Sequence, residues 1–470
     1  MTHVDEVARR AAEAAPGFAA LPAARRAALL EAIADALDAA ADELVAISGD
    51  ETALPEGRLR GELARTTAQL RKFAVVVVEG AYLEVAIDHA DPGDVPPRPD
   101  LRRMLRPIGP VAVFAASNFP FAFSVAGGDT ASALAVGCPV IVKTHPGHPR
   151  TSTATAALVA RAVADQGLHG GVFQIVSGFD EGLALVDAEP IEAVAFTGSL
   201  RGGRALLDRC TARSRPIPFY GELGSLNPVV VTEDADATRG GELAAGLAGS
   251  FQLGDGQFCT KPGLVLVPVG SVLESQLPQH VVATQPRMLT ETIAAGFETG
   301  RDRAAAVPGV TVVAGGASAT SPTVLAADAI TLLAHRELLD EVFGPVTVLV
   351  RYADEAQLDE VLETLEGSLT MTLHAEPAED VRGLATWMTG RAGRVLFGGW
   401  PTGVAVSWAQ HHGGPWPATN TQFTSVGATA VRRFLRPVVY QDAPAAVLPD
   451  GLLDANPLGI PRRVDGRLEL

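Results

Sequence analysis

The sequence predicts an α/β protein with two regions of parallel β-sheet, and three observations support this prediction. The chain has 470 residues, which exceeds the roughly 250–300 at which a single hydrophobic core stops growing. From residue 111 to residue 231, short apolar segments of strand length alternate with alanine-rich segments of helical length. A second alternation of the same kind runs to about residue 428. Because parallel strands need crossover helices, this alternation is typical of βαβ units.

The first 80 residues are predicted to be mainly helical. Pro22 opens a segment in which leucine and isoleucine recur at helical spacing until Ser48 and Gly49. A second helix, rich in arginine, leucine and alanine, is expected after Pro55, and both are interpreted as packing helices. Residues 91–99 contain four prolines, which favours an extended linker or an edge ribbon.

Strand positions follow from the two alternations. The first region predicts strands at 111–115, 140–142, 171–176, 193–196 and 228–231. The second predicts strands near 263–268, 310–313, 346–352 and 394–397, whereas 270–300 shows no strong period and receives no assignment. Ligands of parallel sheets bind at the carboxyl ends of the strands, so the residues that follow each strand are candidates for a site.

Composition excludes several classes of protein. The net charge of −17 argues against nucleic acid or an anionic membrane as a partner. Three widely spaced cysteines suit a reducing compartment better than a disulfide framework. The amino terminus has no basic segment followed by an apolar one, so we expect a cytoplasmic protein without a secretory signal. The histidines show no spacing typical of a metal site, and no metal is predicted.

Cys259 is the first candidate for chemistry. It follows three glycines within residues 249–256 and precedes Lys261 and Pro262. Such a segment can turn sharply and come close to a ligand, and a thiolate there could be stabilised by backbone N–H groups or by Lys261. The alternative is a buried structural cysteine, which is the commoner state of a free cysteine.

Polar residues also follow other predicted strands. Asn118 comes after the first, where its amide could donate to an oxyanion, although a turn or cap is the alternative. Lys143 comes after the second, where it could contact a ribose or a phosphate, or could simply be solvated.

A glycine turn and a carboxylate complete the candidate set. Gly198, Ser199 and Gly203 form a strand–turn–helix junction whose free N–H groups could hold a pyrophosphate. Glu222 precedes a strongly apolar strand, and partial burial there would raise its pKa toward the range useful to a general base. An exposed or capping glutamate is the alternative.

Taken in order, these residues resemble the NAD(P)-dependent aldehyde dehydrogenases over about residues 20 to 440. The matching segments are Asn118-Phe-Pro, Lys143, Phe196-Thr-Gly-Ser, Glu222-Leu-Gly, Gly256-Gln-Phe-Cys259 and Glu341-Val-Phe343-Gly-Pro. The segments that begin at Lys143, Pro401, His412 and Ser425 are similar to the branch that acts on α-ketoglutaric semialdehyde (2,5-dioxopentanoate).

The resemblance implies a chemistry for three residues. Cys259 is expected to add to the aldehyde, because the resulting thiohemiacetal alkoxide expels hydride readily. Asn118 and the backbone N–H of Cys259 would stabilise the oxyanion. Glu222 would then activate water to release the carboxylic acid from the thioester. A CoA-acylating semialdehyde dehydrogenase is a rival, although members of that kind typically lack the glutamate. Two further rivals are another aliphatic aldehyde dehydrogenase and a catalytically silent nucleotide-binding relative.

The resemblance also implies a cofactor, NAD or NADP. Glu341 would hydrogen-bond the nicotinamide ribose, Phe343 would pack beside the nicotinamide, and Lys143 would contact the adenosine ribose or its phosphate. The pyrophosphate would lie on the turn formed by Gly198, Ser199 and Gly203. Pro146 stands where many members have a glutamate that repels a 2′-phosphate, so NADP is predicted to be accepted and preferred. The nearby His145, His148 and Arg150 are neutral or positive.

Two departures from the family pattern lie on either side of Asn118 in the sequence, and the first alters one wall of the substrate tunnel. Ser117 replaces a common tryptophan, and Gly127 replaces a lysine assigned a proton-relay role elsewhere. The resemblance further implies a cofactor-binding domain at 1–83 and 108–221 and a catalytic domain at 222–428. An oligomerisation element at 84–107 and 429–450 would give a homodimer or homotetramer, and residues 451–470 would form a tail.

Overall fold

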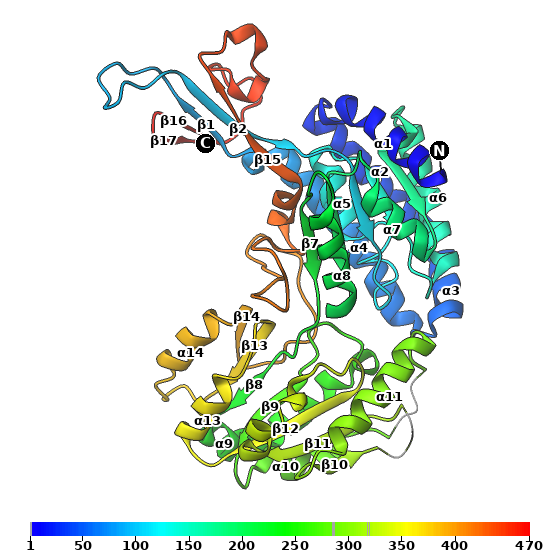
Figure 1. Cartoon of the computed structure of the whole chain (residues 1–470), viewed down its shortest axis with the longest axis vertical. Coiled ribbons are helices and arrows are strands. Elements are labelled where there is room, and N and C mark those ends of the chain that lie inside the picture. Colours follow the sequence, from blue (N-terminus) through cyan, green and yellow to red (C-terminus); the bar gives the residue numbers. More distant parts are fainter. Residues whose placement is uncertain (1, 284–286, 317, 319) are drawn as a thin grey trace.

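The computed structural model describes residues 2–283, 287–316, 318 and 320–470. It contains two α/β lobes and a β-arm that projects from them (Figure 1). The N-terminal lobe holds a five-stranded sheet, the second lobe a seven-stranded sheet, and the arm a separate five-stranded sheet. The predicted α/β fold with two parallel-sheet regions and a small β element is therefore confirmed.

The sheet of the N-terminal lobe has the order β5-β4-β3-β6-β7, and all its neighbouring strands are parallel. Its strands are β3 (Val111–Phe114), β4 (Val140–Lys143), β5 (Phe173–Val176), β6 (Ala193–Thr197) and β7 (Phe219–Glu222). Its crossover helices are α5 (Gly128–Val136), α6 (Pro149–Asp165), α7 (Phe179–Asp187) and α8 (Leu200–Ala212). From β3 the chain adds β4 and β5 on one side of the sheet and then β6 and β7 on the other, so the direction of winding changes at β3. Ligands are expected beyond the carboxyl ends of the strands at such a point.

Four helices precede this sheet: α1 (His3–Ala19), α2 (Ala23–Ala39), α3 (Ala41–Thr52) and α4 (Glu56–Glu79). Pro22 and Pro55 are the N-caps of α2 and α4, as their fixed φ favours. The single helix predicted after Pro22 is two helices, because the chain leaves helical geometry at Ala40. Leucines and isoleucines of α2 are fully buried, and this helix packs against α4, α5 and α6.

The second lobe has the strand order β10-β11-β12-β9-β8-β13-β14, and β10 is its only antiparallel strand within the described residues. Its strands are β8 (Val229–Val231), β9 (Leu264–Pro268), β10 (Thr311–Gly315), β11 (Thr323–Asp328), β12 (Val346–Tyr352), β13 (Ser368–His374) and β14 (Ala392–Phe397). Its helices are α9 (Glu233–Phe251), α10 (Val272–Gln276), α11 (Glu291–Ala305), α12 (Ala329–Ala334), α13 (Glu355–Leu362) and α14 (Arg382–Thr389).

The sequence prediction places one strand of this lobe wrongly and misses two others. The sequence predicts residues 228–231 in the first sheet, but β8 pairs with β9 and β13 of the second lobe. The error arises because β7, which completes the first sheet, is short and ends on a charged residue, so it carries no apolar strand pattern. Strands β11 and β13 have no counterpart among the predicted strands, and the unassigned segment 270–300 contains α10 and the start of α11.

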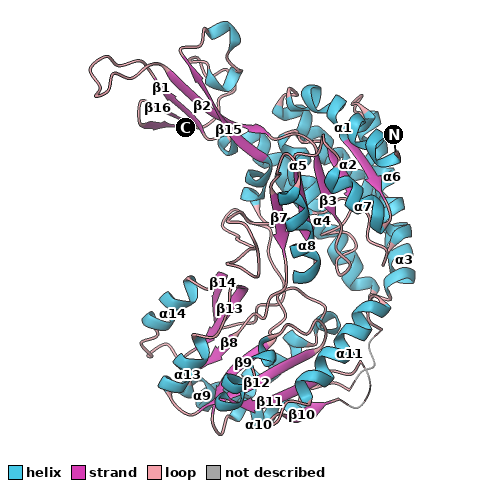
Figure 2. Cartoon of the chain, in the orientation of Figure 1, coloured by secondary structure: helices cyan, strands magenta, loops and turns pink. Residues whose placement is uncertain are grey.

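The β-arm extends from the N-terminal lobe, away from the second lobe, and Figure 2 shows its strands in magenta. Its sheet has the order β15-β2-β1-β16-β17. The strands are β1 (Val85–Asp88), β2 (Leu101–Pro107), β15 (Leu435–Gln441), β16 (Arg462–Val464) and β17 (Arg467–Glu469). The proline-rich residues 91–99 form the loop between β1 and β2. Residues 451–470 are not a separate tail, because β16 pairs in parallel with β1.

None of the helices in the described part of the chain has the length and apolar character needed to cross a bilayer.

Candidate active site

Cys259 lies in a tightly constrained loop between the short 3₁₀ helix η3 (Leu253–Gly256) and β9. Gly256 has a φ of +64°, and a Cβ there would lie 2.3 Å from the carbonyl of Gly344, so only glycine permits this approach of two loops. Asn227 fixes the other side, since its Nδ2 donates to the carbonyl oxygens of Cys259 (2.8 Å) and Lys261 (3.0 Å). The thiol is thus held in a defined, partly buried position.

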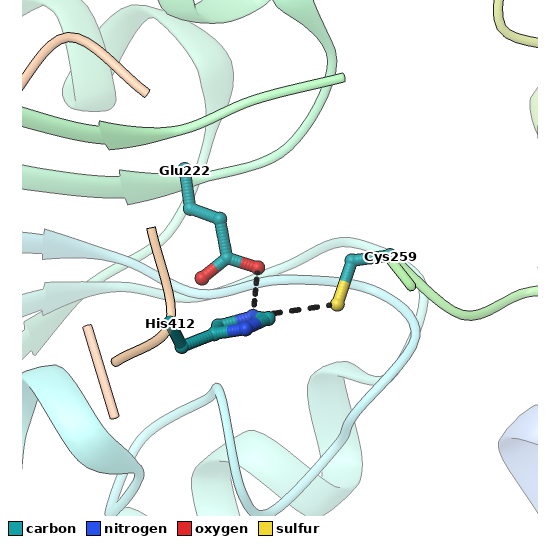
Figure 3. A group of neighbouring side chains, drawn as sticks. All are labelled: Glu222, Cys259 and His412. Carbon is teal, nitrogen blue, oxygen red and sulfur yellow. Dashed lines mark hydrogen bonds and ion pairs between the residues drawn. The ribbon is translucent and has the colours of Figure 1, made fainter. Parts of the chain in front are cut away.

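Glu222 and His412 meet Cys259 from two other segments of the chain (Figure 3). Glu222 ends β7, and His412 comes from the loop between β14 and the 3₁₀ helix η6 (Ala428–Phe434). His412 Nε2 lies 2.8 Å from Glu222 Oε1 and 3.6 Å from Cys259 Sγ. The Ser425 hydroxyl donates to Glu222 Oε2 at 2.7 Å, so both carboxylate oxygens are engaged. The side chains of Glu222 and His412 are 3% and 1% exposed.

The electrostatics of the cluster favour a protonated Cys259 thiol and an ionised Glu222 carboxylate. Burial raises the pKa of the Cys259 thiol well above its usual value, the adjacent Glu222 raises it further, and Arg65 acts in the opposite direction. Burial also raises the pKa of Glu222, but His412, Ser425 and Cys259 outweigh it and hold the net pKa below its usual value. The expectation of a raised Glu222 pKa is therefore wrong, because hydrogen bonds favour the ionised form. An ionised carboxylate beside a protonated thiol can act as its base.

Asn118 directs its amide toward the cysteine loop. It follows β3, is 8% exposed, and its Nδ2 donates to the carbonyl oxygen of Gln257 at 3.1 Å. A side-chain amide has two N–H donors, so one remains for an oxyanion formed at Cys259. The structure thus brings Asn118, Glu222 and Cys259 together from three separate segments. Gly127 cannot carry a larger residue on this backbone, because a Cβ would lie 2.5 Å from the carbonyl oxygen of Ala122.

Two arginines of α4 lie near Asn118 and Cys259: Arg58 Nη2 donates to the carbonyl oxygen of Asn118 at 2.8 Å, and Arg65 acts on the Cys259 thiol. Nη1 of Arg58 and both Nη atoms of Arg65 are buried, and no described residue accepts a hydrogen bond from them. The Arg65 guanidinium lies 5.2 Å from the ring centre of Phe123, and that of Arg58 lies 4.7 Å from that of Phe258. We call these four side chains, with Phe119, which contacts both phenylalanines, the arginine recess.

The recess lies close enough to the thiol for Arg65 to lower the pKa of Cys259. The buried carboxylate of Glu62 offsets part of the charge of both arginines, but Nη1 of Arg58 and both Nη atoms of Arg65 still lack a hydrogen-bond acceptor among the described residues, which a bound carboxylate could supply. The sequence pattern indicated only a packing helix at α4, so neither arginine was among the predicted site residues. The available signal was their spacing of seven residues, which places Arg58 and Arg65 on the face that also carries the buried Glu62.

The turn predicted to hold a pyrophosphate has the expected local structure. Gly198 joins β6 to α8, and Ser199 is the N-cap of α8, whose Oγ accepts from the backbone N–H of Gly202 at 3.2 Å. A Cβ at Gly203 would lie 2.0 Å from Leu223, so glycine allows the helix to pack against the end of β7. The helix N-terminus therefore offers backbone N–H groups beside the strand that carries Glu222.

The remaining cofactor candidates are Lys143, Glu341 and Phe343. Lys143 ends β4, and partial burial lowers its pKa. Glu341 is exposed, and its Oε2 accepts from the backbone N–H of Ser225 at 3.2 Å. A Cβ at Gly224 would lie 2.6 Å from that oxygen and 3.8 Å from Cβ of Leu200, the first residue of α8. Glu341 and the helix N-terminus thus lie on either side of Gly224. Phe343 is partly buried in the loop before β12.

The histidines near Lys143 are neutral rather than positive groups. His148 is fully buried, with Nε2 2.9 Å from the carbonyl oxygen of Ala116, and burial lowers its pKa. Burial lowers the pKa of His145 to about 3. Arg150 is exposed and lies 3.7 Å from Asp50. The replacement of the usual glutamate thus removes a negative charge without adding a histidine cation.

Glu222, Cys259 and His412 also present three ligand-type atoms within 4.8 Å of one another. Two ligands on a tetrahedral Zn²⁺ at about 2.0–2.2 Å are separated by about 3.4 Å. The 2.8 Å separation of His412 Nε2 and Glu222 Oε1 is shorter and is that of a hydrogen bond. The cluster is arranged for proton chemistry.

Comparison with known proteins places this site in a family context. Residues 1–289 match the model of the aldehyde dehydrogenase family. The chain is 47% identical to alpha-ketoglutaric semialdehyde dehydrogenase 2 of Azospirillum brasilense, over 99% of this chain and 92% of that protein. It is 40% identical to alpha-ketoglutaric semialdehyde dehydrogenase of Acinetobacter baylyi, over 100% of this chain and 92% of that protein.

Solved structures share the fold at lower identity. A mutant of aldehyde dehydrogenase C from Pseudomonas syringae, in complex with NAD⁺ and octanal, has a TM-score of 0.77 and 22% identity, over 94% of this chain and 89% of that one. A mutant of proline utilization A from Bradyrhizobium japonicum has a TM-score of 0.79 and 21% identity. That match covers 93% of this chain and 44% of the longer protein, so the chain spans less than half of its length.

Proposed function

The chain belongs to the aldehyde dehydrogenase family, whose members oxidise aldehydes to carboxylates, and we propose that its substrate is α-ketoglutaric semialdehyde. Two relatives named for this substrate match essentially the whole chain. The observation that carries the proposal is the arginine recess beside Cys259. The substrate has an aldehyde at one end and a carboxylate at the other, so the carboxylate would pair the buried guanidinium while the aldehyde meets the thiol.

The chain's own residues support the first half of the reaction. Glu222 accepts the thiol proton, and Cys259 sulfur forms a bond to the aldehyde carbon, leaving an oxyanion. The free N–H of the Asn118 amide and the backbone N–H of Cys259 would stabilise this oxyanion. A bound nicotinamide cofactor would supply the acceptor for the hydride that leaves the former aldehyde carbon.

The second half is hydrolysis of the Cys259 thioester. Glu222, after giving its first proton to solvent, accepts a proton from water as the water oxygen bonds to the acyl carbon. The sulfur leaves as thiolate, and the carboxylic acid is released. Glu222 is present and both its carboxylate oxygens are held by hydrogen bonds, so a base that can activate water is in place. This favours water over CoA as the acyl acceptor. The recess favours an acidic semialdehyde over a simple aliphatic aldehyde.

For the cofactor, we propose that NADP is accepted and preferred over NAD. The N-terminus of α8, Lys143 and Glu341 provide partners for pyrophosphate and ribose groups. Pro146 leaves no carboxylate at the position from which many family members repel a 2′-phosphate. Lys143 makes no hydrogen bond within the described residues, so its ammonium is available to a phosphate. A higher kcat/KM with NAD than with NADP would contradict this proposal.

The substrate proposal is tested by a panel of three aldehydes. Reduced cofactor is measured with α-ketoglutaric semialdehyde, with succinic semialdehyde and with pentanal, each with and without CoA. We expect the highest kcat/KM for α-ketoglutaric semialdehyde and no requirement for CoA. Equal kcat/KM for pentanal, which has the same chain length but no carboxylate, would refute the role of the recess. A requirement for CoA would refute hydrolysis.

We further propose that the β-arm joins a second copy of this chain. Strand β15 pairs on one side with β2 and lies at the edge of the arm's sheet, and its Val439 is 53% exposed. An edge strand with unpaired backbone groups can extend its sheet through a partner strand. Light scattering in solution should give the mass of a dimer or tetramer, and a monomer would contradict the proposal.

A further inference from the structure

A single ring nitrogen of His412 contacts both reacting groups of the site. Its Nε2 lies 2.8 Å from Glu222 Oε1 and 3.6 Å from Cys259 Sγ, as Figure 3 shows. An ionised carboxylate accepts hydrogen bonds and donates none, so the short contact requires a hydrogen on Nε2. In the structure this N–H is donated to Glu222 Oε1. Cys259 Sγ, at the longer distance, is its second acceptor.

The loop that carries His412 is anchored to the same carboxylate. The backbone N–H of His412 donates to Thr424 Oγ1 at 2.8 Å, and the Ser425 hydroxyl contacts both the carbonyl oxygen of His412 and Glu222 Oε2. The ring is thus held against Glu222 and can reach sulfur without movement of the loop.

The surrounding charges are few. The groups that face His412 are Glu222, Cys259 and its neighbour His411. Arg65, Arg394 and Glu341 act on Cys259 from other elements. Within the described residues, His412 Nε2 is the only side-chain nitrogen in hydrogen-bond contact with Cys259 Sγ, so it is placed to stabilise a newly formed thiolate.

We propose that His412 is a third catalytic residue, whose Nε2–H is donated alternately to the general base and to the nucleophile. When the S–H bond of Cys259 breaks, its proton forms an O–H bond with Glu222 and the electron pair stays on sulfur. Protonated Glu222 accepts a hydrogen bond more weakly than the ionised carboxylate does. The Nε2–H of His412 is therefore donated to the thiolate instead. His412 neither gains nor loses a proton in this exchange.

The exchange also orders the later steps. Once sulfur has bonded to the substrate carbon, it carries no charge and attracts the N–H weakly. Glu222 releases its proton to solvent, becomes ionised and recovers the His412 hydrogen bond, which orients it toward the attacking water. The inference rests on the proposed reaction for these later steps, but the thiolate step can be measured without substrate or cofactor.

The test is alkylation of Cys259 by iodoacetamide across about pH 6 to about pH 10. His412→Leu removes the donor at similar volume, whereas His412→Gln keeps a neutral N–H near the position of Nε2. Because a charge-assisted hydrogen bond is lost, His412→Leu should slow alkylation near neutral pH by about ten- to a hundredfold. His412→Gln should recover most of the wild-type rate, because it keeps an N–H donor for the thiolate.

Two outcomes would overturn the inference. Equal rates for wild type and His412→Leu at every pH would show that the donor does not act on the thiolate. An equal loss in both variants at every pH would show a structural role. Cys138 and Cys210 are fully buried, so they provide an internal background for labelling. Failure of the wild type to oxidise α-ketoglutaric semialdehyde would refute the proposed substrate and leave this measurement intact.

Discussion

Replacement of Arg65 by methionine gives a quantitative test of the arginine recess. Methionine keeps most of the side-chain volume over Phe123 but removes the charge and both buried Nη donors. Two parallel N–H bonds to a carboxylate are the strongest arrangement open to a guanidinium. Breaking a buried, hydrogen-bonded charge pair costs about 2–5 kcal/mol, so binding of the semialdehyde transition state should weaken by about 3 kcal/mol.

The expected result is a loss of specificity rather than of chemistry. Since 1.4 kcal/mol corresponds to a factor of ten, kcat/KM for α-ketoglutaric semialdehyde should fall by about a hundredfold relative to that for pentanal. Arg65 also lowers the pKa of Cys259, so its loss should slow the reaction of both substrates by a common factor. The ratio of the two kcat/KM values removes this common factor and isolates carboxylate binding.

A matched control lies on the same helix. Arg60 is 46% exposed and pairs with Asp42 and Glu56, so Arg60→Met should leave the ratio unchanged. Steady-state formation of reduced cofactor, with each aldehyde at several concentrations, supplies both kcat/KM values. An unchanged ratio in Arg65→Met would refute the assignment of the substrate carboxylate to the recess.

Three other outcomes follow from the site. Glu222→Gln should form its first equivalent of reduced cofactor more slowly than the wild type, because the thiol loses its base, and should turn over about 10²–10⁴-fold more slowly, because the thioester also waits for one; rapid-quench measurement of both phases checks this, and wild-type turnover would contradict it. Burial and Glu222 raise the pKa of Cys259, so a smaller fraction of the thiol is ionised at a given pH. The alkylation rate of the free enzyme should therefore still increase above about pH 8.5, where the rate for an ordinary thiol begins to level off. A plateau at lower pH would contradict the raised pKa. Dialysis against EDTA should leave turnover unchanged, because His412 and Glu222 are separated by a hydrogen-bond distance; activity lost to EDTA and restored by Zn²⁺ would argue for a metal.

The order of polar residues along the chain accounts for much of the site prediction. Asn118, Lys143 and Gly198 each follow a strand of one parallel sheet, and such strands end at a common edge. Glu222 and Cys259 were recognised from short segments around them. The residue patterns alone left a structural alternative open at Asn118, Lys143, Glu222 and Cys259, and the resemblance to the aldehyde dehydrogenases grouped them into one site.

His412 and Arg65 could not be assigned roles in this way. Each lies in a segment with no local sign of catalysis, one in an irregular loop and the other in a helix with an ordinary amphipathic pattern. The division between β7 and β8 was also missed, since strand membership depends on pairing partners rather than on apolar content.

Residue type, periodicity and strand order were enough to establish the α/β class and to single out Cys259 and Glu222 as the candidate thiol and carboxylate. The protonation of Glu222, the donor beside the thiol and the cation in the arginine recess emerged only from the folded chain. Those properties depend on burial and on contacts between residues as far apart as Glu222 and His412, which approach one another only when the chain has folded.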